Sequence, residues 1–228
     1  MSEVEQIKEL LAKCSRQQRQ EIFQFLRKEF GIHPLEAELN VQAEVILEAI
    51  HKSSDLTFRG IRGVIAEAAF EVNIASKLTG FEVVPVKGDM AYDCLLRDAN
   101  GDIRIQVKMQ RLKDHRPMMA KEAFQYLPAD KYVVETQRTR GGRDHATGKS
   151  TRPYRFGEFD ILAVSFHPST KDSNRFLYTA ERWLISSPDE PECLLKFQPV
   201  PVHPNSDWTD DLPTCISWFR SATRKTIS

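Results

Sequence analysis

The fold is decided by residues 92–111, which read YDCLLRDANGDIRIQVKMQR. At the centre of this stretch, Asn100-Gly101 is a strong signal for a two-residue hairpin turn, because both residues adopt positive φ at low cost. Every second residue from Ile103 to Val107 is apolar, which predicts a strand whose polar face carries Gln106 and Lys108. The stretch therefore predicts a β-hairpin.

With Asn100 and Gly101 as the loop, Asp93 is expected directly opposite Lys108, with Cβ atoms roughly 5 Å apart. One acid, the amide oxygen of Gln106 and one ammonium would then meet on one patch of sheet. Such a patch can hold a hard divalent cation and activate a water beside a phosphate. The alternative is an ordinary surface hairpin with alternating polar residues.

A second signal precedes the hairpin. Residues 60–79 have the apolar pattern of a largely buried helix that Gly80 ends, and this helix carries Glu67 and, one turn later, Glu71. Carboxylates on an apolar helix are costly to bury unless they are paired or bound to metal. We expect this helix to pack on the sheet and to aim one carboxylate at Asp93; the alternative is that this face meets solvent.

The middle of the chain is basic although the whole chain, with 32 Lys+Arg and 32 Asp+Glu, is neutral. Residues 104–155 hold 13 Lys/Arg against 5 Asp/Glu, a balance of +8, while residues 186–215 hold 1 against 6, a balance of −5. Arginine forks and hydroxyls between residues 136 and 155 suit phosphate oxygens and guanine edges, although a solvated loop is the alternative. The candidate DNA contacts are Arg111, Lys113, Arg138, Arg140, Arg143, Lys149, Arg152, Tyr154 and Arg155, with His145 as a further phosphate contact.

The remaining elements follow from periodicity. Residues 3–30 predict two helices, with Ser15 and Gln18 capping the second, and Pro34 opens a linker or a further helix. Strands are expected at residues 81–86, 131–135, 159–166 and 176–178, short helices at 117–124 (or a loop) and 181–184, and extended or irregular chain at 186–215. We therefore predict an α/β fold, with an N-terminal helical region at 1–55 and a second domain at 56–228.

Other classes are disfavoured. The N-terminus lacks the basic and apolar regions of a signal peptide, and no apolar run is long enough to span a membrane, so the expected location is the cytoplasm. The four cysteines have no short Cys/His spacing, so neither a zinc site nor a disulfide framework is expected.

Residues 60–110, roughly a quarter of the chain, resemble the PD-(D/E)XK nuclease superfamily in a QxK form. The resemblance rests on the helix with Glu67, on Tyr92-Asp93, and on Ile105-Gln106-Val107-Lys108. It implies a restriction-endonuclease-like core in which Asp93 binds metal, Gln106 stands where the family has a second acid, Lys108 positions the attacking water, and Glu67 is the helix glutamate. Two features depart from the pattern: no proline precedes Asp93, and Gln106 removes one negative charge. Metal binding would then depend on Asp93, Glu67, a backbone carbonyl such as that of Val107, and phosphate oxygens.

The resemblance implies a Mg²⁺-dependent endonuclease, with Mn²⁺ as a possible substitute, acting on double-stranded DNA. A type II restriction endonuclease, working as a homodimer, is favoured by the extended core, the Arg/Thr/Tyr loop and the lack of a GxxxxGK[ST] motif. Two alternatives stay open. The first is a structure-specific nuclease of the junction-resolvase kind, and the second is a non-catalytic DNA-binding subunit, which Gln106 keeps in consideration.

Overall fold

The computed structural model describes residues 2–30, 33–138, 141–142 and 151–227. The chain forms two compact units, Met1–Phe58 and Arg59–Ser228. The boundary falls within helix α5 (Asp55–Asn73), whereas the sequence prediction placed it at residue 55. The two units are described separately.

The first unit is helical. Helices α1 (Glu3–Lys13) and α2 (Arg16–Glu29) are separated at Ser15, whose hydroxyl accepts the Gln18 N–H while the Gln18 side chain accepts the Ser15 N–H. This capping box, which the sequence predicts, satisfies two backbone donors at the start of α2. Helices α3 (Pro34–Leu39) and α4 (Ala43–His51) follow, so the chain after Pro34 is helical rather than an open linker.

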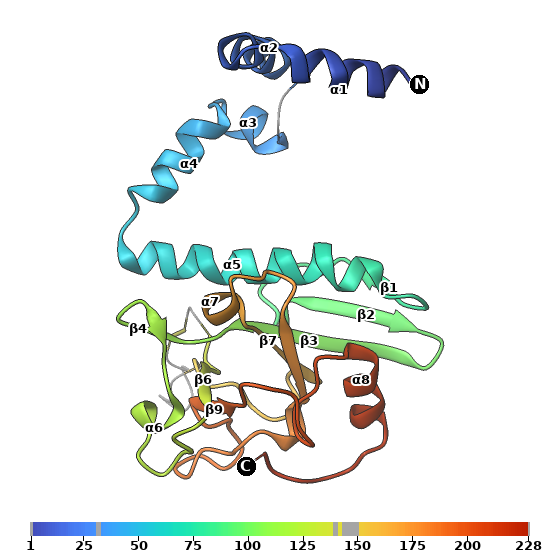
Figure 1. The fold of residues 1–228 in the computed structure, drawn as a ribbon. Helices are drawn as coiled ribbons and strands as arrows, with labels where there is room; N and C mark the ends of the chain where they lie inside the picture. The colour runs from blue at the N-terminus through green and yellow to red at the C-terminus, as the bar shows by residue number, and fades with distance from the viewer. Residues whose placement is uncertain (1, 31–32, 139–140, 143–150, 228) are drawn as a thin grey trace. The chain divides into compact units, whose positions relative to one another are not determined.

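The second unit is built on a five-stranded mixed sheet with strand order β1-β2-β3-β7-β8 (Figure 1). Neighbouring strands are antiparallel except β3 and β7, which are parallel. The mixed α/β class expected from the sequence is confirmed. The strands are β1 (Glu82–Val84), β2 (Cys94–Asp98), β3 (Gly101–Met109), β7 (Ile161–Ser165) and β8 (Phe176–Ala180).

Two strand lengths have clear local causes. The first strand ends at Val84 rather than at residue 86, because Pro85 has no amide hydrogen to donate to a ladder. The whole of β7 is buried, and β3 and β8 pair with its two edges, which explains its unbroken run of apolar residues.

Helix α5 differs from the predicted span of 60–79. It begins at Asp55, where the Ser54 hydroxyl accepts the Thr57 N–H, and it ends at Asn73, before a short 3₁₀ helix, η1 (Ala75–Lys77). The expectation that the helix is largely buried is wrong, because only Ala66 and Phe70 are fully buried within it. Three of its other apolar side chains, those of Val64, Ile65 and Val72, are more than half exposed. The helix therefore packs by one narrow stripe.

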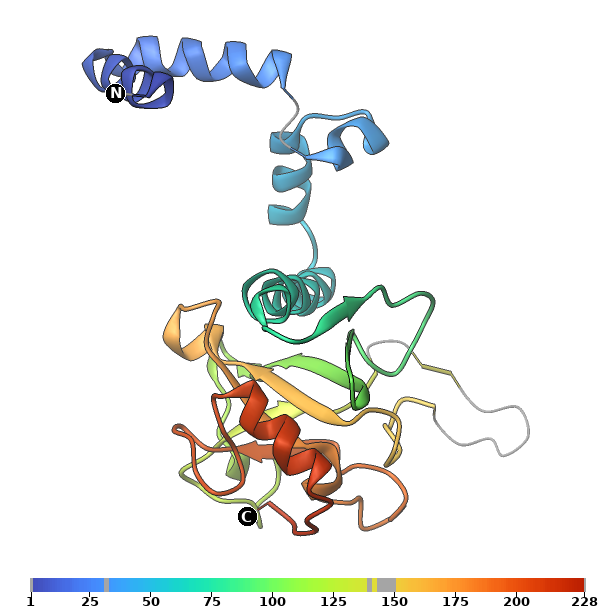
Figure 2. The ribbon, with the colours of Figure 1, turned by 90° about the vertical axis from the view of Figure 1, so that its right-hand side faces the viewer.

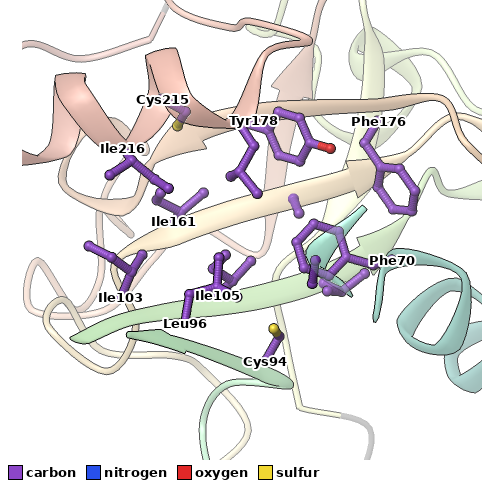
Figure 3. Close-up of a cluster of buried hydrophobic side chains, with 14 of the residues drawn as sticks. Phe70, Cys94, Leu96, Ile103, Ile105, Ile161, Phe176, Tyr178, Cys215 and Ile216 are labelled. Carbon is purple, nitrogen blue, oxygen red and sulfur yellow. The ribbon is translucent and has the colours of Figure 1, made fainter. Parts of the chain in front are cut away.

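That stripe contacts one face of the sheet. Figure 2 looks along α5 and shows the strands lying against it. Ala66 and Phe70 pack with side chains of β2, β3, β7 and β8, and helix α8 (Leu212–Arg220) adds Cys215 and Ile216 to the same core (Figure 3). Phe70 meets Phe176 and Tyr178 edge-on, with ring centroids 5.5 and 6.3 Å apart. Burial of this apolar area holds the two helices on the sheet.

The opposite face is covered by the C-terminal half of the chain. Its apolar cluster includes Leu162, Val164, Tyr154, Trp183 and Trp208. A two-stranded sheet of β6 (Tyr132–Glu135) and β9 (Phe197–Val200) also contributes to this side. The remaining elements are β4 (Leu112–Lys113), β5 (Arg116–Pro117), α6 (Ala120–Ala123), α7 (His167–Thr170) and the 3₁₀ helix η2 (Glu181–Trp183).

The acidic segment 186–215 is less irregular than its prolines suggest, because it contains β9 and the start of α8. Among the described residues, no helix combines the length and the apolar character that crossing a bilayer requires.

Candidate active site

The β2–β3 hairpin is present, but its register differs from the prediction. Cys94 pairs with Ile105 and Asp98 with Gly101, so the loop consists of Ala99 and Asn100. Asp93 lies just before the paired residues, and its N–H donates at 3.0 Å to the carbonyl of Ile105, the residue that pairs with Cys94. The expected pairing of Asp93 with Lys108 is therefore wrong.

The cause lies in Asp98. Its Oδ1 accepts the Asn100 N–H at 2.8 Å, and Arg220 of α8 holds both of its oxygens in a fork at 2.6 and 2.7 Å. An aspartate that bonds the backbone two residues on starts a turn at its own position. Gly101, at φ 112°, becomes the first residue of β3. A register shift of two residues preserves the faces of a strand, so Gln106 and Lys108 stay on one side.

The Asp93 carboxylate is held by β3. Its Oδ2 accepts the Val107 N–H at 2.8 Å and also a hydrogen bond from the Gln106 Nε2. Gln106 is 1% exposed, and its Nε2 also donates to the Val107 carbonyl at 3.2 Å. Burial raises the pKa of Asp93, against the opposing effects of the Lys108 charge and the Val107 hydrogen bond. Gln106 thus fixes the orientation of the acid.

Of the two helix glutamates, Glu67 is the one that reaches this patch. Burial raises the pKa of Glu67, the charge of Asp93 raises it further, and the charge of Lys108 lowers it. Glu71 is exposed, and its charge acts on the buried thiol of Cys94 instead. Two half-buried carboxylates, Glu67 and Asp93, therefore share one electrostatic environment with one ammonium.

Lys108 is half-buried and lies against an aromatic ring. Its Nζ is 5.4 Å from the centroid of Tyr154, and the Arg138 guanidinium carbon is 5.2 Å from the same centroid. In the part of the chain that the structure describes, no carboxylate forms an ion pair with Lys108. Tyr154 is only 4% exposed, so it offers little surface to a nucleic acid, in contrast to the DNA contact expected for it.

The other predicted DNA contacts that the structure describes are at least partly exposed, but most have acidic partners. Arg111 pairs with Glu135 at 3.5 Å, Lys113 with Glu122 at 3.4 Å, and Arg155 with Glu192 at 3.6 Å. Arg152 is exposed, and its Nε donates to the Arg138 carbonyl at 3.3 Å. Arg140, Arg143, Lys149 and His145 lie outside the described residues.

Sequence reasoning missed the acids that follow the basic stretch. Asp160 receives hydrogen bonds from the Arg104 side chain at 2.7 and 3.0 Å, and Glu158 pairs with Arg138 at 2.8 Å. Both acids follow the basic residues 104–155, so the local excess of +8 overstates the free positive charge. The available signal was two acids placed just before the apolar run of β7.

Comparisons with known proteins add little. No family model and no curated protein matches the chain. A solved structure, the bacterial homing endonuclease I-Ssp6803I, is similar at 20% sequence identity and a TM-score of 0.32, over 54% of this chain and 68% of that one. This similarity is too slight to support an argument about function. The geometry of the site itself is the basis for assigning one.

Proposed function

We propose that this chain is a Mg²⁺-dependent DNA endonuclease, most similar in kind to a type II restriction endonuclease. The observation that carries the proposal is that four polar side chains meet at one site. Gln106 and Lys108 come from β3, Asp93 directly precedes β2, and Glu67 comes from α5. An acid, an amide, an ammonium and a second acid at one end of a hairpin suit phosphodiester hydrolysis. On this basis the mixed sheet with its helices is a restriction-endonuclease-like core.

The donor set fits a hard divalent cation. Both described hydrogen bonds to the Asp93 carboxylate are made to Oδ2, which leaves Oδ1 to act as a ligand. Burial raises the pKa of both Asp93 and Glu67, and their mutual repulsion adds to the cost of ionising them side by side. A cation between the two carboxylates would remove that cost. Asp93 and Glu67 would hold Mg²⁺, or Mn²⁺ in its place, with the oxygens of Gln106 and Val107 as secondary ligands. When bound, the cation supplies Lewis acidity toward a phosphodiester oxygen and toward water.

The protein's own residues would orient the reaction. Gln106 and the Val107 N–H keep Asp93 in one position, so its free oxygen is preorganised. Because no described carboxylate forms an ion pair with Lys108, its ammonium could orient an attacking water and offset the negative charge that develops on the phosphate. Phosphodiester cleavage needs these groups held in fixed relation more than it needs new covalent chemistry.

Double-stranded DNA is the proposed partner. Arg111 and Lys113 follow β3 in the chain, Arg152 and Arg155 flank Tyr154, and all four would exchange their carboxylate or carbonyl partners for phosphate oxygens. A homodimer would cut both strands of a two-fold symmetric sequence, and it belongs to this proposal.

The test is incubation of the purified protein with unmethylated phage-length DNA and Mg²⁺, with EDTA as a control. We expect discrete fragments that disappear with EDTA and in both Asp93→Ala and Lys108→Ala, whereas Lys77→Ala, a change at an exposed lysine of η1, leaves cleavage unchanged. Titration with Mg²⁺ alone should show that Asp93→Ala weakens metal binding and that Lys108→Ala does not.

Other results would select another function. Wild-type activity in either Asp93→Ala or Lys108→Ala would contradict the site. Cleavage confined to branched DNA would favour a junction-resolving nuclease. DNA binding without cleavage of any substrate would favour the non-catalytic alternative. That alternative is supported by Gln106, whose amide removes one negative charge from the candidate metal site.

A further inference from the structure

Tyr154 is a buried ring at the edge of the candidate site. Its side chain is 4% exposed and belongs to the apolar cluster on the sheet face opposite α5. The Tyr154 and Phe159 rings meet edge-on, with centroids 5.5 Å apart and planes at 87°. A ring packed in this way keeps one orientation, because the side chains around it would have to move before it could turn. It is a rigid feature beside a flexible lysine.

Two cations share this ring. The Lys108 Nζ and the Arg138 guanidinium carbon lie 5.4 and 5.2 Å from its centroid, within the range of cation–π attraction. Burial raises the pKa of the Tyr154 hydroxyl, and the charge of Lys108 and a hydrogen bond with it act in the opposite direction. The phenol is therefore neutral at physiological pH, and it lies next to the ammonium of Lys108.

Arg138 is held in place by an ion pair with Glu158. Its guanidinium pairs with Glu158 at 2.8 Å, and the other oxygen of Glu158 accepts the Arg155 N–H at 2.9 Å. We call residues 138–152 the basic segment and its two ends, Arg138 and Arg152, the base of that segment. The Arg138 N–H donates to the Arg152 carbonyl at 2.9 Å, which joins the two ends. Tyr154 therefore stands between the base of that segment and Lys108.

We propose that Tyr154 is a positioning residue for Lys108: its buried ring and hydroxyl hold the ammonium at the site, in a fixed relation to the base of the basic segment. This inference rests on the proposed nuclease function. A free lysine side chain samples many rotamers, and reaction requires its charge in one place. Because Tyr154 has almost no exposed surface, its effect reaches the substrate through Lys108 and not by contact with DNA.

The test separates the hydroxyl from the ring. Tyr154→Phe keeps the ring and loses the hydroxyl, Tyr154→Leu loses both, and Tyr126→Phe, at a tyrosine that is 66% exposed, is the matched control. In single-turnover cleavage we expect Tyr154→Phe to lower the rate constant about tenfold and Tyr154→Leu about a hundredfold, with the DNA dissociation constant unchanged. A wild-type rate in Tyr154→Phe, or a loss confined to DNA binding, would overturn the assignment.

A second measurement does not depend on activity. In protein whose lysines carry ¹³C-methyl groups, the Lys108 resonance, identified by its loss in Lys108→Arg, should be displaced upfield by the ring current of Tyr154. Tyr154→Phe should retain this displacement and Tyr154→Leu should abolish it, with circular dichroism confirming that both variants fold. A Lys108 resonance at the position of exposed lysines in the wild type would refute the contact. If the wild type cleaves no DNA but the displacement is present, the proposed function fails while the positioning of Lys108 stands.

Discussion

Glu181 is the single residue whose burial has the clearest thermodynamic consequence. It is 5% exposed, and its Oε1 accepts the Gly157 N–H at 2.7 Å. Burial raises the pKa of Glu181 to about 7, although that hydrogen bond and the charges of Arg104 and Arg182 favour the ionised form. The folded protein therefore binds a proton at Glu181 more tightly than the unfolded chain does.

A folded-state pKa above the unfolded value stabilises the protein fully at low pH, and the stabilisation is lost as the pH rises through the folded-state pKa. For Glu181 the loss occurs between pH 4.5 and about 7. Glu181→Gln stays neutral and keeps an oxygen for Gly157, so we expect it to remove this dependence. Urea unfolding should show the variant gaining on the order of 3 kcal/mol relative to the wild type between pH 4.5 and 8. An equal difference at both pH values would show that Glu181 does not titrate in this range.

At the scale of elements, the base of the basic segment and the β2–β3 hairpin are linked through Tyr154. Arg138 and Arg152 join the two ends of the segment by backbone and side-chain hydrogen bonds, next to the ring that contacts β3. On the proposed function, this placement would bring a bound phosphate close to the site.

Arg138→Ala combined with Arg152→Ala should weaken DNA binding and reduce its salt dependence. The logarithm of the DNA-binding constant falls linearly with the logarithm of the salt concentration. Each lost phosphate contact makes this slope less steep by about 0.9, because fewer counterions are released. Fluorescence anisotropy at several salt concentrations measures this slope, and Arg224→Ala, at an exposed arginine of the C-terminal tail, is the control. An unchanged slope in the double variant would mean that another surface binds DNA.

At the scale of the whole molecule, the second unit holds the described apolar clusters. Their buried members begin at Ala66 and end at Ile227, and in the first unit α1, α3 and α4 contain no fully buried residue. The stability of residues 59–228 should therefore not depend on the first unit.

A fragment of residues 53–228, which retains the Ser54 cap of α5, should unfold cooperatively in urea. Its midpoint should match the main transition of the full chain, because the same apolar area is buried in both. A fragment without a cooperative transition would show that the removed residues complete the core. Cleavage by this fragment, compared with the full chain, would separate the role of the first unit in DNA binding from its role in folding.

Short-range features of the chain were predictable from sequence. The alternation from Ile103 to Val107 determines which side chains share a face, since successive residues of a strand point to opposite sides. Ser15 with Gln18 determines a helix start, because each side chain acts on backbone groups within a few residues. Pro85 ends β1 by an equally local effect, although the predicted strand ran on to residue 86. These patterns were enough to bring Asp93, Gln106 and Lys108 together as a candidate site.

Long-range contacts decided the rest. The hairpin register depends on Asp98, which Arg220 holds from 122 residues away. The reach of Glu67, rather than Glu71, depends on the narrow stripe by which α5 packs on the sheet. Tyr154 is buried in a cluster that the chain after β7 completes, and Arg138 pairs with Glu158 across 20 residues. Neighbouring residues determine local backbone conformation, whereas burial and charge pairing depend on which distant segments of the chain pack against one another.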